Sequence, residues 1–211
     1  MNPITFFQFP VNKIRGALIF AAKQDIRYYL NGVFFQRAPN GKGIIAVSTD
    51  GHRLTVIYHE QDVSQVPSDW AGVILPREEL ERAAKFPLKA DKITLDAAFI
   101  VGERITIRTA VTIECAAIEG KYPDYQRVIP PLRGRRHCGL ATVNANYLAD
   151  YAKLSALLKP NGRSEITISS VDANSSIVVG IGVPECVCIL MPLRGSPEED
   201  LQDRAWLSGA A

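Results

Sequence analysis

Long hydrophobic runs are missing from this chain of 211 residues. The longest apolar stretches span residues 33–35, 177–182 and 187–191, far short of the ~20 residues that a membrane-spanning helix needs. The first five residues show no basic region followed by an apolar stretch, so no secretory signal is evident. We therefore expect a cytoplasmic protein with no membrane partner.

Cysteine is scarce, and its positions fit no disulfide or zinc pattern. The four cysteines are Cys115, Cys138, Cys186 and Cys188. A disulfide framework is not expected in a cytoplasmic chain of this size. Cys186 and Cys188 are two apart in an expected strand, so both face one side. Cys138 and His137 could complete a metal site with them, but the spacing matches no standard zinc pattern. We expect buried structural thiols, with no metal and no cofactor.

A large excess of charge of one sign is also absent. The chain has 24 Lys and Arg against 22 Asp and Glu, a net charge of +2. The distribution is more informative, because residues 196–211 form an acidic tail with four acidic residues and one arginine. The remaining body is mildly basic, which permits weak binding of a polyanion without establishing it.

Recognisable catalytic motifs are missing as well. His52 lies close to Asp50, but no nucleophile or third orienting group stands at a known motif. The glycines around Lys42 lack the spacing of a phosphate-binding loop. The carboxylates that a Mg²⁺ site would need are scattered: Asp91, Asp96, Asp124 and Asp172. We therefore expect a protein that is not an enzyme, and a nuclease is disfavoured.

What is present is a pattern of strand, helix and several strands that occurs three times. Helices are expected at residues 11–23, 77–86 and 147–158, with Asn144 as the N-cap of the last. The expected strands are residues 28–35, 43–48, 53–58, 73–75, 92–95, 99–101, 104–109, 112–117, 139–143, 165–169, 176–181 and 186–191. This pattern predicts an α+β fold with helices on one side of curved sheets. On periodicity alone, a chance division of an ordinary α+β chain stays open.

Three motifs are far more specific than the periodicity. The first joins residues 24–32 (QDIRYYLNG) to residues 49–54 (TDGHRL), the second is residues 119–130 (EGKYPDYQRVIP), and the third is residues 190–194 (LMPLR). Together they resemble the bacterial sliding clamp family, the beta subunit of DNA polymerase III. The resemblance runs in the correct order over roughly residues 4–195.

The resemblance implies a DNA clamp fold built from three strand-helix-strand half-domain units. Residues 1–129 resemble one complete clamp domain, the central one, and residues 130–195 resemble the second half of the last domain. An orphan half-domain exposes a sheet edge and an apolar helix face, which soluble proteins avoid. We therefore expect a homo-oligomer in which two third units complete each other. A tetrameric ring is the preferred form and a plain dimer is the runner-up.

In this family a ring holds double-stranded DNA by topology, so the contacts need only be weak and independent of sequence. The resemblance places the candidate DNA-binding residues on the helices that line the hole. For each of these charges, an ordinary solvated surface is the alternative. The candidates are Lys13, Arg15, Lys23, Arg77, Arg82, Lys85 and Lys153.

The resemblance also implies a hydrophobic pocket that captures short peptide motifs of DNA polymerases, clamp loaders and repair proteins. The alternative makes Leu54 and Ile189 core residues and places Gly51 in a simple tight turn. The matching residues are Leu30, Thr49, Gly51, His52, Arg53, Leu54, Pro130, Ile189, Leu190, Met191, Pro192 and Leu193.

Two functions therefore follow from the resemblance. The first is a processivity factor that encircles duplex DNA and docks its partners. The second is a protein-interaction module that binds the same peptides without forming a ring. Residues 202–207 of the tail, QDRAWL, weakly resemble a clamp-binding peptide and could occupy the pocket. A tail that packs elsewhere or stays disordered is the alternative.

Overall fold

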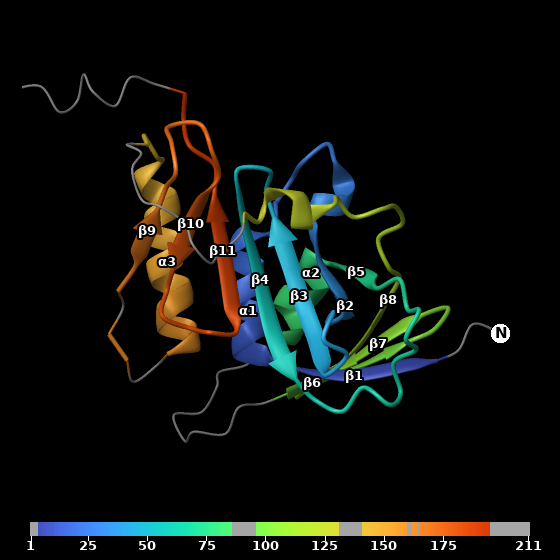
Figure 1. Ribbon diagram of the computed structural model, residues 1–211. Coiled ribbons are helices and arrows are strands. Elements are labelled where there is room, and N and C mark those ends of the chain that lie inside the picture. Colours follow the sequence, from blue (N-terminus) through green and yellow to red (C-terminus); the bar gives the residue numbers. More distant parts are fainter. Residues whose placement is uncertain (1–3, 86–95, 131–140, 160–161, 164, 195–211) are drawn as a thin grey trace, which may run out of the picture.

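The computed structural model describes residues 4–85, 96–130, 141–159, 162–163 and 165–194. The expected strand 92–95, the start of the expected strand 139–143, and the tail 196–211 lie outside these residues, as do His137 and Cys138. Two antiparallel sheets and three α-helices make up the described part (Figure 1). The expected α+β class is confirmed.

The first sheet has four strands, and the second has seven. The order in the first sheet is β1 (Thr5–Pro10), β6 (Asp96–Val101), β7 (Ile105–Arg108) and β8 (Thr112–Cys115). The order in the second is β5 (Val73–Pro76), β2 (Gly32–Arg37), β3 (Gly43–Thr49), β4 (Arg53–Glu60), β11 (Cys186–Leu190), β10 (Ile177–Gly180) and β9 (Thr167–Ser169). The helices are α1 (Val11–Phe20), α2 (Arg77–Ala83) and α3 (Ala145–Leu158), with short 3₁₀ helices η1 (Tyr28–Leu30) and η2 (Tyr125–Val128).

Two of the three units exchange their first strands. β1 directly precedes α1 but pairs with β6, and β5 directly precedes α2 but pairs with β2. The rings of Phe7, Phe35 and Phe99 meet where the two sheets converge, with centroids 4.8–5.6 Å apart. This exchange and its aromatic core join the first two units to each other.

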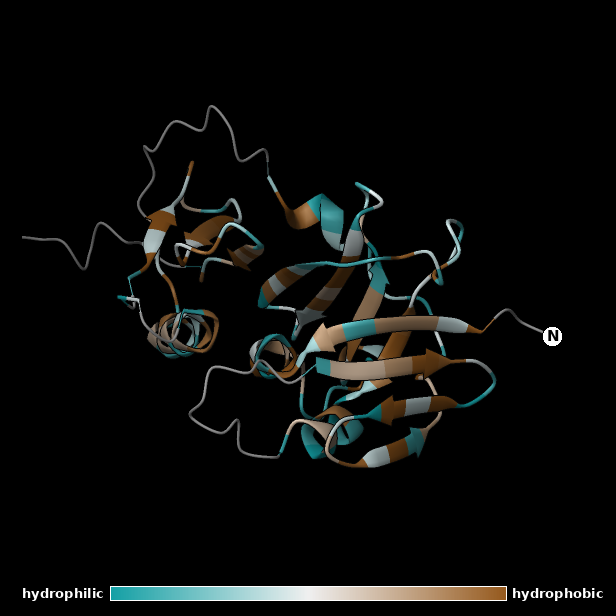
Figure 2. Ribbon diagram, turned by 90° about the horizontal axis from the view of Figure 1, so that it is seen from below, coloured by the Kyte–Doolittle hydropathy of each residue, from teal (hydrophilic) through white to brown (hydrophobic). Residues whose placement is uncertain are grey.

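The third unit extends the second sheet and adds its helix beside α1. β11 pairs antiparallel with β4, for example Ile189 with Leu54. α3 and α1 lie side by side, seen nearly end-on in Figure 2. The α1 residue at the crossing is Gly16, where an added Cβ would lie 2.6 Å from Leu154 Cδ1. A side chain here would force Leu154 to shift, so the glycine favours this close helix contact.

Helix and strand ends follow local hydrogen bonding. Asn144 caps α3 as expected, since its side-chain oxygen accepts from the Asn146 N–H at 2.9 Å. α1 ends at Phe20 instead of residue 23, because Ala21 is extended and the Ala22 N–H bonds to Leu30 O. α2 ends at Ala83 and not at residue 86.

Two expected strands were wrong in part. Residues 28–30 form η1 and not a strand, because the Asn31 N–H closes a turn onto Tyr28 O. The described part of the expected strand 139–143, residues 141–143, has no strand assignment. Within the described residues, its one backbone bond to another segment is the contact of Thr142 O with the Leu193 N–H.

Both faces of the seven-stranded sheet are covered. Most of the core lies on the helix side, around Ile14, Phe20, Tyr151 and Leu154. A smaller cluster on the opposite face includes Val47, Leu54, Tyr122 and Ile189. We call this opposite face the outer face. The outer cluster forms the floor of the site described below.

Cys115 and Cys188 are buried, and Cys186 and Cys188 face the same side with their sulfur atoms 3.5 Å apart. This geometry confirms the expected orientation of the pair. Among the residues that the structure describes, no cluster of three or more His, Cys, Asp or Glu side chains could hold a metal ion. Within the same residues, no helix is long and apolar enough to span a membrane.

Candidate functional site

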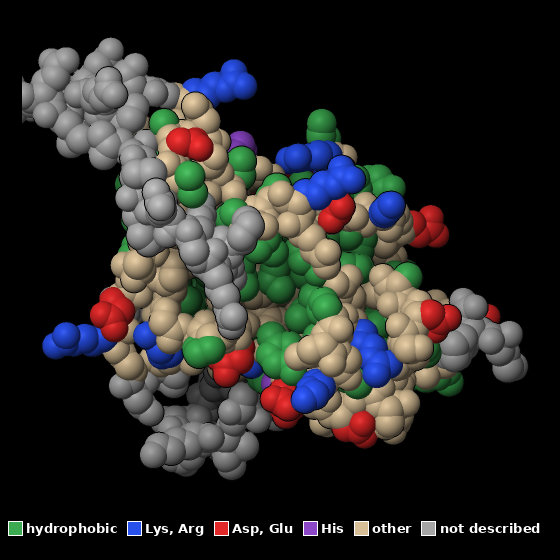
Figure 3. Space-filling model, in the orientation of Figure 1, with side chains coloured by type: hydrophobic (Ala, Val, Ile, Leu, Met, Phe, Trp, Pro, Cys, Tyr) green, Lys and Arg blue, Asp and Glu red, His purple; other side chains and the backbone are tan. Residues whose placement is uncertain are grey.

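An apolar cavity of about 210 Å³ opens on the outer face, at the ends of β3 and β11. Figure 3 shows hydrophobic side chains gathered in the central hollow of this face. Three segments form the walls of the cavity: the turn between β3 and β4, the end of β11, and the segment that contains η2. The lining residues are Arg27, Leu30, Thr49, Gly51, Arg53, Leu54, Pro123, Asp124, Tyr125, Val128, Ile189 and Met191.

The turn between β3 and β4 is held by its own side chains. Asp50 Oδ1 accepts from the backbone N–H groups of His52 and Arg53, at 3.0 and 3.1 Å. The Thr49 hydroxyl donates to Arg53 O at 2.7 Å and accepts from the Gly51 N–H at 3.0 Å. Gly51 has φ +90°, a backbone conformation that disfavours any residue with a side chain. A side chain there would also collide with the Arg27 guanidinium. The turn is therefore a rigid rim.

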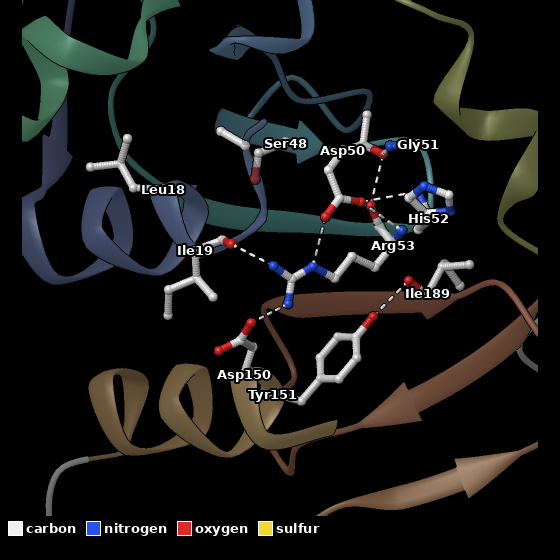
Figure 4. Close-up of polar contacts among 12 residues, drawn as sticks. Leu18, Ile19, Ser48, Asp50, Gly51, His52, Arg53, Asp150, Tyr151 and Ile189 are labelled. Atoms are coloured by element: carbon white, nitrogen blue, oxygen red, sulfur yellow. Dashed lines mark hydrogen bonds and ion pairs between the residues drawn. The ribbon is translucent and has the colours of Figure 1, made fainter. Parts of the chain in front are cut away.

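Arg53 connects this rim to the helices (Figure 4). Its side chain is only 10% exposed. Nε contacts Asp50 at 3.0 Å, Nη1 pairs with Asp150 on α3, and Nη2 donates to Ile19 O at 3.0 Å. The guanidinium also lies 5.0 Å from the Phe20 ring centroid and 4.6 Å from that of Tyr147. One buried cation thus joins α1, β4 and α3.

Burial and pairing act in opposite directions on the ionisation of this group. Burial lowers the pKa of Arg53. The hydrogen bonds with Asp150 and Asp50 raise it by more than burial lowers it, so the net shift is upward. Burial raises the pKa of Asp150, but hydrogen bonds from Lys153 and Arg53 outweigh burial and lower it. Both groups are therefore charged at neutral pH.

Two more hydrogen bonds fix β11, one from α3 and one to the rim. The Tyr151 hydroxyl of α3 donates to Ile189 O at 2.7 Å, and the Met191 N–H donates to His52 O at 2.9 Å. The first places Ile189 in the cavity floor, and the second fixes Met191 at its edge. The cavity therefore needs both the first and the third unit.

The third wall is anchored by two tyrosines. The Tyr122 ring stacks on Phe34, with centroids 5.0 Å apart and planes 12° apart. Gln36 Nε2 donates to the Tyr125 hydroxyl at 2.6 Å. Burial raises the pKa of both tyrosines, so both hydroxyls stay neutral. This packing fixes η2 beside the cavity and places Val128 at its mouth, 38% exposed.

Of the expected pocket residues, the structure brings seven together around the cavity: Leu30, Thr49, Gly51, Arg53, Leu54, Ile189 and Met191. The other five do not line it. Leu190 belongs to the helix-side core, because successive strand residues face opposite sides of a sheet. His52 lies over the Tyr147 ring at 6.2 Å, and the Leu193 N–H bonds to Thr142 O. Pro130 and Pro192 are half-buried outside the lining.

Five lining residues were not expected: Arg27, Pro123, Asp124, Tyr125 and Val128. All of them fall inside the family motifs, residues 24–32 and 119–130. Pro123-Asp124 followed by Tyr125 is typical of a short turn, but a turn signal does not indicate a cavity wall. The position of residues 123–128 follows from the packing of Tyr122 and Tyr125 against β2, which no local pattern encodes.

The candidate DNA-binding side chains fall into two groups. Three are half-buried and donate to carbonyls of their own chain. Lys13 donates to Tyr58 O, Arg15 to Ala84 O, and Arg77 to Leu18 O and Ala21 O. The other four are exposed: Lys23, Arg82, Lys85 and Lys153.

Two of the exposed cations have anionic neighbours. Arg82 pairs with Glu79, and Lys153 pairs with Asp150. In the described part of the chain, neither Lys23 nor Lys85 forms an ion pair. These two lysines carry the least compensated positive charge of the seven candidates.

Comparison with known proteins decides the family. The family model for the DNA polymerase III beta subunit, central domain, matches residues 10–124, more than half of the chain. The chain belongs to this family. The beta sliding clamp of Pseudomonas aeruginosa is 35% identical over 112 residues, which are 52% of this chain and 28% of that protein. The clamp of Caulobacter vibrioides is 26% identical over 181 residues, 79% of this chain and 46% of that protein.

The fold agrees with the assignment of the chain to the DNA polymerase III beta subunit family. A sliding clamp from Bartonella birtlesii, solved with griselimycin bound, matches with a TM-score of 0.71 at 22% identity, over 90% of this chain and 66% of that chain. The DNA clamp fold expected from the motifs is therefore confirmed. The chain spans less than half the length of the two curated relatives described above.

Proposed function

We propose that this member of the beta-subunit family is a clamp-like processivity factor that tethers partner proteins to duplex DNA without reading its sequence. The apolar cavity between the first and third units carries the proposal. Its aliphatic and methionine lining suits a short peptide with large apolar side chains. The expected partners are a DNA polymerase, a clamp loader or a repair protein. The role is mechanical and cytoplasmic, and involves no catalysis.

The DNA contact in this proposal is electrostatic. Lys23, Arg82, Lys85 and Lys153 project from helices or from the residues just after them. Lysine and arginine side chains of this kind neutralise phosphates and release counterions, which gives weak and salt-dependent attraction. A collar of chains would convert this weak attraction into lasting retention. We propose a homo-oligomer, with the tetrameric ring preferred over a dimer.

One observation favours the second candidate, a peptide-binding module without a ring. Lys13, Arg15 and Arg77 donate to carbonyls inside their own chain, which occupies donor groups that DNA phosphates would otherwise accept from. The cavity does not depend on these residues. Peptide binding without DNA retention would therefore identify this alternative.

The direct test of the pocket uses two exposed side chains of one segment. Met191 lines the cavity and Leu193 does not, although both are exposed. The probes are a fluorescent peptide with the sequence of residues 202–207 and, separately, griselimycin. Fluorescence anisotropy and calorimetry with the full chain should show binding that Met191→Ala weakens at least tenfold, a loss typical of a buried anchor. Leu193→Ala should match the unsubstituted chain.

Equal affinities in all three proteins would contradict the proposed pocket. Failure of the unsubstituted chain to bind either probe would contradict it equally. Both variants truncate an exposed side chain, so thermal unfolding should be unchanged and serves as the folding control.

A further inference from the structure

The complete domain shows what fills the sheet edge of each unit. β1 directly precedes α1 and pairs with β6 of the other unit, with Phe7 opposite Phe99. β5 directly precedes α2 and pairs with β2, with Ile74 opposite Phe34. Each unit therefore gives the strand before its helix and receives the corresponding strand from its sister.

The third unit has the same parts without a described sister. α3 is preceded by residues 141–143, and the order of the second sheet ends at β9. Each unit has three consecutive strands after its helix: β2-β3-β4, β6-β7-β8 and β9-β10-β11. β9 is the first of its three, as β2 and β6 are in the other units. Among the described residues, no strand pairs with the outer edge of β9 or with residues 141–143.

One hydrogen bond shows that residues 141–143 already occupy the position of an exchanged strand. In the second unit, the Ile118 N–H donates to Ile74 O at 2.9 Å. Ile74 lies three residues before α2, and Ile118 lies three residues after β8. In the third unit, the Leu193 N–H donates to Thr142 O at 2.8 Å. Thr142 lies three residues before α3, and Leu193 three residues after β11.

The same comparison shows an unfilled edge. One edge of β5 contacts residue 118, and the opposite edge pairs with β2. The equivalent side of residues 141–143 has no described strand beside it. Burial agrees: Phe35 of β2 and Phe99 of β6 are fully buried, whereas Ile168 of β9 is 46% exposed and Ile166 beside it is 36% exposed. An open aliphatic strand edge of this kind is a surface for strand addition.

We propose that a second copy of this chain completes the third unit by reciprocal strand addition. Residues 141–143 of each copy pair antiparallel with β9 of the other, so that the two third units form one domain with exact two-fold symmetry. This inference rests on the oligomer of the proposed function and adds its surface. The second copy is the fitting occupant, because each copy offers both the strand that is missing and the edge that lacks it.

The test is the mass of the full chain in solution, measured by sedimentation velocity at several micromolar concentrations. The unsubstituted chain should sediment as a multiple of its 23.2 kDa mass. Ile168→Lys places a charge on the half-exposed edge and should weaken self-association at least tenfold. Ile26→Lys is the matched control, because Ile26 is 99% exposed and lies outside the third unit. It should leave the mass unchanged.

Amide hydrogen exchange provides a second readout on the same proteins. Oligomerisation should protect residues 166–169 and 141–143, and Ile168→Lys should remove that protection while the β3 amides stay protected. A chain that remains monomeric at these concentrations would overturn the inference, as would an Ile168→Lys protein that keeps its full mass. Capture of an unrelated protein's strand by a monomeric chain would also overturn it. None of these results affects peptide binding, because the pocket is complete within one chain.

Discussion

At the scale of single residues, Arg53 has the largest structural role. Its side chain is 10% exposed and hydrogen-bonds to three groups: Asp50 in its own turn, Asp150 on α3, and the Ile19 carbonyl on α1. A buried charge without these partners would be strongly destabilising. The arginine therefore connects the rim of the apolar cavity to the packing of the third unit, and a change in one should affect the other.

Replacement of one partner tests this coupling. Asp150→Asn keeps the size of the side chain and removes its charge. We expect the free energy of unfolding to fall by about 1 kcal/mol, since the pair is partly shielded from solvent. Urea denaturation at neutral pH measures the loss. Lys153→Gln removes the exposed partner of the same carboxylate and should cost less than about 0.5 kcal/mol. Equal losses in both variants would contradict the role assigned to Arg53.

The same carboxylate predicts a pH dependence. The hydrogen bonds from Lys153 and Arg53 lower the pKa of Asp150 below its usual 3.8. A depressed carboxyl pKa contributes stability above the unfolded value, and that stability is lost as the pH falls through the folded value. The stability difference between the unsubstituted chain and Asp150→Asn should therefore shrink below pH 3.8. A difference that stays constant with pH would show that Asp150 acts through packing alone.

Much of the pocket could be predicted at the residue scale, but not all. Leu54 and Ile189 follow from motifs and strand alternation, and both lie in the outer cluster. The same alternation rule places Leu190 on the opposite face, where the motif alone suggested a pocket residue. Tyr125 and Val128 could not be placed from local patterns, because stacking of Tyr122 on Phe34 decides where that segment lies.

At the scale of elements, Gly16 reports on the contact between α1 and α3. In a helix interior, alanine is more favourable than glycine by about 1 kcal/mol of helix propensity. Here the added methyl group would meet Leu154 Cδ1 at 2.6 Å and Ile57 Cδ1 at 3.3 Å. Overpacking of this kind costs roughly 1–3 kcal/mol. We expect Gly16→Ala to lower the free energy of unfolding by about 1 kcal/mol in thermal or urea denaturation.

A double-mutant cycle provides the control for Gly16→Ala. Leu154→Ala removes the methyl group that the new side chain would meet. In that background Gly16→Ala should cost much less stability, because the clash with Leu154 is gone and alanine has the higher helix propensity. The same loss in both backgrounds would mean that the helices do not approach as closely as described.

Prediction succeeded for elements whose signals are local. The cap at Asn144 and most strands around β3, β4 and β11 lie close to their expected positions. It failed for residues 28–30, where the apolar aromatic run has strand character but closes a 3₁₀ turn. It failed also for residues 141–143, since a strand exists only where a neighbour pairs with it.

At the scale of the whole molecule, pairing of β4 with β11 joins the strands of the first and third units, together with β5 of the second, into one seven-stranded sheet. Periodicity alone could not predict this pairing, because it joins segments more than a hundred residues apart. The family motifs placed residues 49–54 and 189–193 in one pocket, but they did not predict that the two strands pair. The helices then lie on the side opposite the apolar cavity, so the proposed surfaces for DNA and for partners face different directions.

This arrangement predicts how DNA binding responds to salt. Replacing both Lys23 and Lys85 by glutamine should flatten the dependence of log affinity on log salt concentration by about 2, one for each lost phosphate contact. Fluorescence anisotropy with duplexes of different sequence measures the effect, and the affinities should not depend on sequence. Lys121→Gln is the control, because this exposed lysine belongs to the outer-face segment. An equal effect from Lys121→Gln would contradict the assignment of DNA to the helix side.

The shape of the assembled chains tests the central proposal most directly. Electron microscopy of the purified oligomer should show closed collars with a central opening that admits a duplex, lined by the helices. Addition of DNA should fill that opening. Particles that are single chains, or closed assemblies with no opening wide enough for double-stranded DNA, would contradict the proposal that this protein encircles DNA.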